Sequence, residues 1–108
     1  MPLGQNLALN SISTDFGDVL VAEGELDLSS APRLSEAFDR SESGNLFVDL
    51  RGVNFMDSAG LAVLVREKNR CDGIGKPMTL IIENGPVLRL IDLVSLRDHF
   101  AISPTLTY

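Results

Sequence analysis

The chain has 108 residues, of which 15 are acidic and nine basic, so its formal net charge is −6. This charge repels nucleic-acid backbones and anionic membrane surfaces, and no apolar run approaches the roughly 20 residues of a membrane span. A single cysteine, Cys71, excludes an internal disulfide, and the first residues lack the basic and apolar regions of a signal peptide. We therefore expect one cytoplasmic domain over residues 1–108 that binds neither nucleic acid nor membrane.

The N-terminal segment has the pattern of two strands joined by a turn. Residues 7–13 place Leu7 and Leu9 on one side and polar or small side chains on the other, which indicates a half-exposed strand. Residues 14–18 contain the Asp and Gly residues that favour turns, and residues 19–22 continue as a more buried strand. The sequence therefore predicts an N-terminal β-hairpin.

A helix is predicted after the hairpin. Either Ser29 or Ser30 is expected to cap it, and Pro32 fits its first turn. The spacing of its apolar residues places three of them on one face: Ala31, Leu34 and Phe38. Residues 41–45, which include Gly and Asn, are expected to end this helix.

The central segment predicts a strand, a helix and a second strand. Residues 46–50 form a short apolar run typical of an interior strand, and we assign residues 51–56 to a loop. The second helix is expected over residues 57–72, with a mostly solvated segment at residues 66–70. Residues 78–82 have the pattern of the next interior strand. This order predicts two parallel strands joined by a right-handed crossover.

The C-terminal third predicts one more helix and an edge strand. We expect Gly73 to end the second helix in a left-handed conformation, and Asn84 to cap a third helix that has Pro86 in its first turn. The apolar residues of the third helix share one face: Val87, Leu90, Ile91 and Val94. Residues 99–102 are assigned to a short edge strand and residues 103–108 to a loose tail. The fold class is α/β, with a mixed β-sheet, an N-terminal hairpin and three to four helices.

Ser58 is the most informative residue for function, because it lies where a strand-and-loop segment passes into a helix. The first N–H groups of a helix lack intrahelical partners and carry partial positive charge, so a phosphate is tolerated there. Asp57 is a candidate cap for this helix, and Gly60 would permit close approach to the sheet or to a partner. A phosphate on Ser58 beside Asp57 would make this surface strongly anionic. Without its flanking pattern, Ser58 would be interpreted simply as a residue that starts a helix.

Two segments of the chain resemble a known family. Residues 53–61, Val-Asn-Phe-Met-Asp-Ser-Ala-Gly-Leu, resemble the signature of STAS-domain anti-sigma factor antagonists. Residues 24–27, Gly-Glu-Leu-Asp, followed by Ser30 and Ala31, resemble the family's second motif. The order of predicted elements also agrees over essentially the whole chain, so the resemblance implies the STAS fold. One departure is Val94-Ser95, which stands where a threonine-glycine pair commonly ends the last helix, so we expect the geometry there to differ.

The resemblance implies a phosphorylation switch. By resemblance, Ser58 is phosphorylated with ATP by the partner, an anti-sigma factor that is itself a serine kinase, and a serine phosphatase resets it. The unphosphorylated chain would hold the kinase and free the sigma factor. The partner-binding residues implied are Asp27, Asp57, Ser58, Ala59 and Gly60. The chain would not be an enzyme, would need no cofactor, and would be a monomer or weak homodimer.

Other functional classes require features that the sequence lacks or leaves open. A hydrolase with Ser58 as nucleophile would have His99 as its only histidine base, and the residues around Ser58 do not form a Gly-x-Ser-x-Gly elbow. One histidine and one cysteine without close spacing do not form a metal site. A non-enzymatic STAS scaffold, or an accessory subunit of a transporter, remains the alternative within the same fold.

Overall fold

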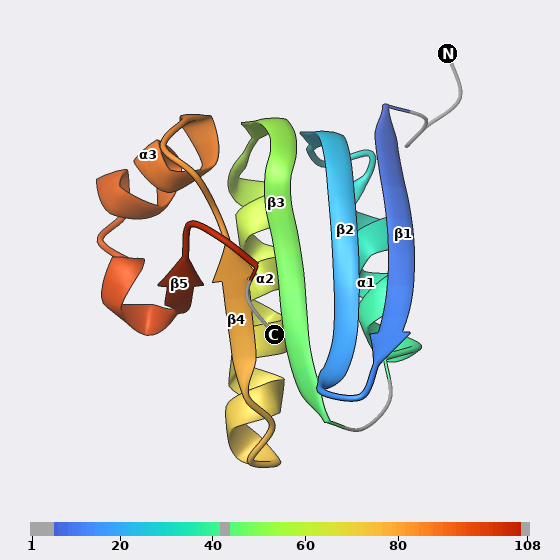
Figure 1. The fold of residues 1–108 in the computed structure, drawn as a ribbon. Helices are drawn as coiled ribbons and strands as arrows, with labels where there is room; N and C mark the ends of the chain where they lie inside the picture. The colour runs from blue at the N-terminus through green and yellow to red at the C-terminus, as the bar shows by residue number, and fades with distance from the viewer. Residues whose placement is uncertain (1–5, 42–43, 107–108) are drawn as a thin grey trace.

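The computed structural model describes residues 6–41 and 44–106. Within these ranges, five strands form one sheet in the order β1-β2-β3-β4-β5 (Figure 1). The strands are β1 (Leu7–Thr14), β2 (Gly17–Leu26), β3 (Asn45–Met56), β4 (Met78–Ile81) and β5 (Ala101–Ser103). β1 is antiparallel to β2, and every other neighbouring pair is parallel. The predicted hairpin and mixed sheet are therefore confirmed. The edge strand is present, but it covers Ala101–Ser103 instead of residues 99–102, so it includes the first residue of the predicted tail.

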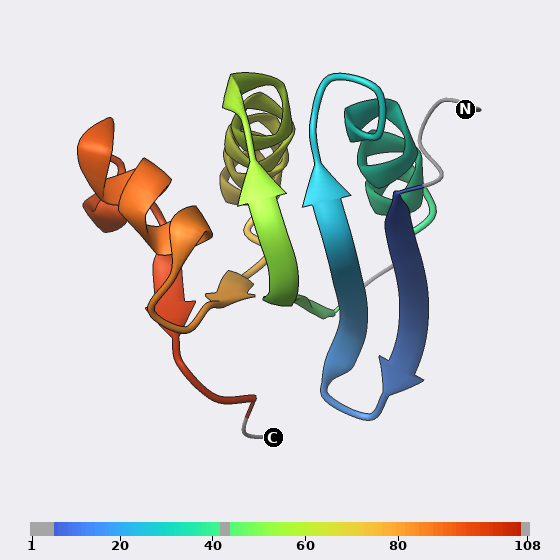
Figure 2. The ribbon, with the colours of Figure 1, turned by 90° about the horizontal axis from the view of Figure 1, so that it is seen from above.

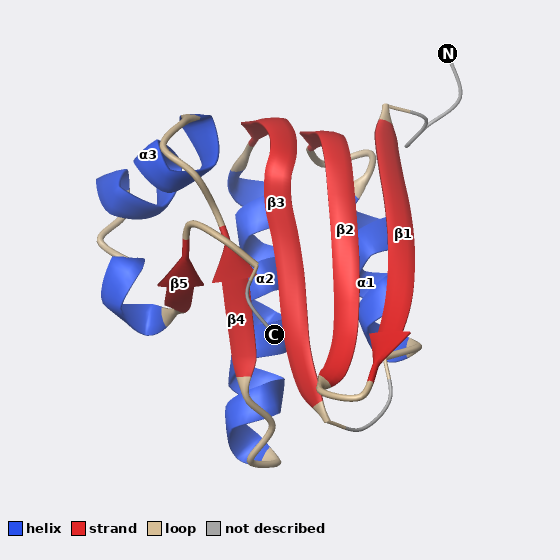
Figure 3. Ribbon diagram, in the orientation of Figure 1, coloured by secondary structure: helices blue, strands red, loops and turns tan. Residues whose placement is uncertain are grey.

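Three α-helices and one short 3₁₀ helix accompany the sheet in the described residues. They are α1 (Ala31–Asp39), α2 (Ser58–Gly73), α3 (Pro86–Leu93) and the 3₁₀ helix η1 (Arg97–His99). α1 and α2 lie side by side on one face of the sheet, whereas α3 and η1 lie at the β4–β5 side (Figures 2 and 3). None of the described helices combines the length and the apolar character that crossing a bilayer requires.

The hydrophobic core fills the space between the sheet and the helices. Leu34 and Phe38 of α1 and Leu64 of α2 are almost fully buried. They meet the side chains of Val48 and Leu80, which alternate with outward-facing residues along β3 and β4. Each buried side chain of this size contributes roughly 1.5–3 kcal/mol to folding. The predicted apolar stripe of α1 is therefore the face that fixes this helix on the sheet.

β3 is longer than predicted, because residues 51–56 belong to the strand and not to a loop. The pairing of β3 with β2 shifts register twice, between Val21 and Glu23 and between Gly24 and Glu25. Such irregularities re-aim a strand without ending it. The mainly apolar run stops at Leu50, and of the later residues of β3 only Val53 and Met56 are buried. Consequently β3 delivers Met56 directly to the start of α2.

The ends of α2 and α3 differ from prediction in their details. α2 runs through Gly73, and the left-handed residue that closes it is Gly75, with φ +71°. The N–H of Lys76 donates to the carbonyl of Cys71 at 2.8 Å, which is the Schellman arrangement. The N-cap of α3 is Gly85, whose extended backbone suits a residue before proline; Asn84 makes no capping bond.

Two further residues correct the sequence analysis. Glu67, which was placed in a solvated segment, is buried, and its carboxylate accepts two bonds from Arg70 at 3.0 and 2.6 Å. This ion pair compensates the removal of the carboxylate from water. Ser95 adopts a left-handed backbone with φ +60° and closes α3 as glycine would, despite a cost of about 1–2 kcal/mol for a residue with a Cβ. Residues 42–43 and 107–108, in the predicted helix end and tail, lie outside the described residues.

Candidate functional site

Asp57 connects the start of α2 to the loop between β2 and α1. Its backbone is extended, and its Oδ1 accepts the N–H groups of Ala59 at 2.9 Å and Gly60 at 3.1 Å. Its Oδ2 accepts the N–H of Leu28 at 3.1 Å. The predicted role of Asp57 as helix cap is confirmed, and the same carboxylate also holds the neighbouring loop.

Asp27 organises that neighbouring loop from within. Its Oδ1 accepts the backbone N–H groups of Ser29 and Ser30, each at 3.0 Å, and the Ser29 hydroxyl at 2.8 Å. Its Oδ2 accepts the side-chain amide of Asn6 at 3.1 Å. These bonds, led by those from the side chains of Ser29 and Asn6, lower the pKa of Asp27 to about 2. Asp27 is therefore ionised at neutral pH, and most of the hydrogen bonds to its carboxylate come from its own loop.

Neither predicted serine caps α1 with its side chain. Ser30 is the N-cap residue, but its hydroxyl donates to the carbonyl of Glu25 at 2.9 Å and accepts the N–H of Asp27 at 2.9 Å. The first-turn N–H groups of α1 bond to backbone carbonyls instead, that of Ala31 to Asp27 at 2.8 Å and that of Arg33 to Ser30 at 2.9 Å. A buried Ser30 thus ties the two ends of the loop together.

Gly60 fixes how closely α2 approaches β2. A Cβ at this position would lie 2.6 Å from the carbonyl oxygen of Leu26 and 2.7 Å from its Cγ. No side chain fits in that space, so α2 begins directly against the end of β2. The expected close approach to the sheet is confirmed, and it brings the two loops of the site into contact.

Ser58 is exposed at the first position of α2. Beside it, Asp27, Leu28, Ser29 and Asp57 line a hollow of about 430 Å³. The structure therefore brings Asp27 and Asp57 to one surface, next to Ser58. Ala59 is half-buried and Gly60 is buried, so both shape the surface more than they present atoms to it.

Leu28 belongs to this surface but was not found from the sequence. Its side chain is 75% exposed, although large apolar side chains usually avoid water. The available signal was a leucine placed between an aspartate and two serines, in a loop with no apolar periodicity. A single exposed leucine is common on protein surfaces, so Leu28 is included here because its backbone N–H bonds to Asp57 and its side chain lines the same hollow.

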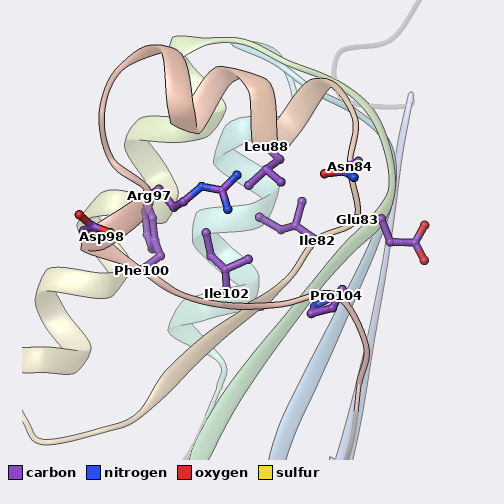
Figure 4. Close-up of a pocket in the computed structure, with 9 residues that line it drawn as sticks. All are labelled: Ile82, Glu83, Asn84, Leu88, Arg97, Asp98, Phe100, Ile102 and Pro104. Atoms are coloured by element: carbon purple, nitrogen blue, oxygen red, sulfur yellow. The ribbon is translucent and has the colours of Figure 1, made fainter.

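A larger hollow lies elsewhere, at the β4–β5 side of the molecule (Figure 4). It measures about 710 Å³ and is lined by Ile82, Glu83, Asn84, Leu88, Arg97, Asp98, Phe100, Ile102 and Pro104. The Arg97 guanidinium makes two bonds to Asp92, at 2.7 and 2.8 Å. Two carboxylates and one guanidinium leave the lining with net negative charge, so an anionic ligand finds no net attraction there. None of the predicted site residues lines it.

His99 does not accompany Ser58. It lies in η1, close to the edge strand β5, and its ring packs edge-on against Phe100 with the ring centroids 5.2 Å apart. Ser58 follows β3, which is an interior strand of the sheet. This placement gives the hydrolase interpretation of Ser58 no support.

Removing the Asp57 cap should destabilise the fold moderately. Asp57→Ala leaves the N–H groups of Leu28, Ala59 and Gly60 without their acceptor, so we expect a loss of about 1–2 kcal/mol. Asp57→Asn keeps an acceptor oxygen for Ala59 and Gly60 but puts an amide NH2, which cannot accept, opposite the N–H of Leu28, so it should lose roughly half as much. Urea unfolding measures both variants. Ser58→Ala is the control and should leave the midpoint nearly unchanged; an unchanged midpoint in Asp57→Ala would contradict the capping role.

The architecture and site together define a small α/β protein of STAS type, with a capped helix start that presents a serine beside an exposed loop. The STAS domain model matches residues 13–107. The chain therefore belongs to the STAS domain family.

Individual relatives agree with this assignment. An anti-sigma-B factor antagonist of Listeria monocytogenes is 30% identical, over 90% of this chain and 87% of its own length. The crystal structure of an anti-sigma factor antagonist from Mycobacterium paratuberculosis is 27% identical and has a TM-score of 0.82, covering 93% of this chain and 87% of that one. The phosphorylated form of the Bacillus protein SpoIIAA shares the fold, with a TM-score of 0.67 at 16% identity, over 89% of this chain and 91% of that one.

Proposed function

We propose that this chain is an anti-sigma factor antagonist switched by phosphorylation of Ser58. In its unphosphorylated form it binds an anti-sigma factor that is also a serine kinase, and the sigma factor is released. Phosphorylation of Ser58 ends this binding, and a serine phosphatase restores it. The observation that carries the proposal is the exposed Ser58 hydroxyl at the start of α2, beside Leu28 and the Asp57 carboxylate.

The phosphoryl transfer requires few groups from this chain. The Ser58 Oγ attacks the γ-phosphorus of ATP, the bond to the ADP oxygen breaks, and the hydroxyl proton passes to a base of the kinase. The phosphatase then transfers the phosphoryl group to water. The chain supplies only an accessible hydroxyl on a rigid helix start, so it acts as substrate and needs no cofactor of its own.

The surface suits a protein partner in the unphosphorylated state, and a phosphate on Ser58 would oppose the same contact. The exposed Leu28 offers an apolar anchor, and the backbone around it is held by Asp27 and Asp57. A phosphate on Ser58 would place about two further negative charges beside Asp57. These charges would face the part of the partner that contacts Leu28. Support also comes from relatives, because SpoIIAA is known in unphosphorylated and phosphorylated forms. A transporter subunit would not need an accessible serine here.

Incubation of the full chain with ATP and the candidate anti-sigma factor kinase tests the proposal. We expect one phosphate per chain, localised to Ser58 by mass spectrometry. Ser58→Ala should abolish the labelling, whereas Ser29→Ala, which removes a second hydroxyl of the same surface, should leave it intact. Labelling that persists in Ser58→Ala, or a kinase that binds the chain tightly without modifying it, would overturn the switch.

A further inference from the structure

The two edges of the sheet are built differently. β5 is three residues long and is followed by Pro104, both of which discourage the addition of another strand. β1 has eight residues, contains neither proline nor a charged side chain, and pairs with β2 over its whole length without a bulge. Figure 2 shows β1 as the outermost strand, with no described helix or strand beyond it. The usual protections of a sheet edge are therefore missing from β1.

The outward hydrogen-bonding groups of β1 can be assigned. The carbonyl of Asn6 accepts the N–H of Glu25, the residue directly opposite, so the backbone of Asn6 faces β2. Because antiparallel strands alternate, the backbone groups of Leu7, Leu9, Ser11 and Ser13 point away from β2. Arg33 donates to the Leu7 carbonyl, which agrees with this assignment. Within the part of the chain that the structure describes, the outward groups of the other three residues have no partner.

A shallow groove runs along the same edge. It has a volume of about 270 Å³ and is lined by Leu9, Ser11, Leu20, Arg33, Glu36, Ala37 and Arg40. Its ionic side chains carry a net charge of +1, from two arginines and one glutamate, whereas the whole chain carries −6. When two copies of this acidic chain meet, the repulsion between them is smallest at a surface whose own charge is small and not negative.

We propose that β1 is a homodimer interface, in which the β1 strands of two copies pair antiparallel across a two-fold axis near Ser11. A strand with outward groups at Leu9, Ser11 and Ser13 is self-complementary in this arrangement, since each N–H meets a C=O of the other copy. The two sheets become one continuous sheet. The contact involves one strand and one groove from each copy, so it is a small interface and the dimer is weak.

The leucines in and after α3 offer less surface for association. Leu88 is buried and Leu96 is half-buried, so of these residues only Leu93 is exposed. The β1 interface also leaves Ser58 accessible, because α2 starts at the end of an interior strand. The dimer therefore does not depend on the proposed switch, and either proposal can fail without the other.

Sedimentation velocity over a wide concentration range tests the dimer with the full chain. Wild type should shift from the monomer mass of 11.7 kDa towards twice that value as concentration rises. Ser11→Pro removes an outward N–H that makes no bond within residues 6–41 and 44–106. By two-fold symmetry, the substitution removes two bonds from the dimer. It should weaken association at least about tenfold. Ser11→Lys, which adds a charge to the edge, should act likewise, and Ser11→Thr should associate as wild type does.

The outcomes separate clearly. Circular dichroism verifies that each variant is folded. If Ser11→Pro is unfolded, Ser11→Lys alone is the test of the interface. A wild-type chain that stays monomeric at every concentration would overturn the proposal. So would a folded Ser11→Lys variant that dimerises as tightly as wild type, because the interface would then lie elsewhere. Slower amide hydrogen exchange at Leu9, Ser11 and Ser13 in concentrated samples would place the contact on β1.

Discussion

Ser58→Asp is expected to weaken binding to the anti-sigma factor by roughly 30-fold or more, whereas Ser58→Ala should bind at least as tightly as wild type. An aspartate at this position introduces one negative charge into a contact that fits a neutral hydroxyl, and leaving a charge unpaired at an interface costs about 2–5 kcal/mol. A phosphoserine carries more charge and should weaken binding further. Calorimetric titration of the partner with each variant measures the difference.

The titration needs a control for charge alone. Asn84→Asp lies at the β4–β5 hollow and adds the same single negative charge away from Ser58, so it should leave the affinity unchanged. Ser58→Asn, which is similar in size to Ser58→Asp but neutral, should bind much more tightly than Ser58→Asp. Equal affinity of wild type, Ser58→Ala and Ser58→Asp would contradict the switch.

The switch is expected to act through charge and not through a conformational change. The Asp57 carboxylate already accepts three backbone N–H groups, and Asp27 accepts two more in the adjacent loop. A phosphate on the exposed Ser58 oxygen need not displace any of these bonds. The partner would therefore meet the same backbone in both states, with a different charge on it. This view agrees with the expectation that Ser58→Ala hardly alters stability.

Much of the site could be predicted because its signals are local. A capping aspartate, a serine in the first helical position and a glycine near the sheet are neighbours in sequence, so the pattern at residues 57–60 identifies the helix start. The order of strands and helices likewise follows from periodicity. The position of Asp27 beside Asp57 was implied only by the family resemblance, because it depends on two strands meeting in space.

Most of the missed features depend on contacts between distant residues. The length of β3 reflects its irregular pairing with β2, whereas the Glu67–Arg70 bond lies within one helix, where such a pair does not by itself indicate burial. The exposure of Leu28 follows from the Asp57 bond that holds its backbone outward in the loop. A periodicity analysis follows the spacing of apolar side chains along one helix or strand. It cannot detect a residue whose environment is determined by a different element.

Gly60→Ala is expected to be the most destabilising single change at the site, with a loss of about 2–4 kcal/mol. The added Cβ would lie 2.6 Å from the Leu26 carbonyl oxygen, which is backbone of an interior strand and cannot move aside cheaply. For a chain of this size the melting temperature should fall by roughly 10–20 °C. Thermal unfolding followed by circular dichroism measures this shift.

Gly73→Ala is the matched control in the same helix. A Cβ at Gly73 would meet nothing within 4 Å, and alanine is favoured over glycine in a helix by up to about 1 kcal/mol, so this variant should be as stable as wild type or slightly more so. If Gly60→Ala were equally harmless, α2 could not be seated against Leu26 as the structure shows. Because that contact also holds Ser58 beside Leu28, a folded Gly60→Ala chain should bind the anti-sigma factor more weakly while keeping its serine.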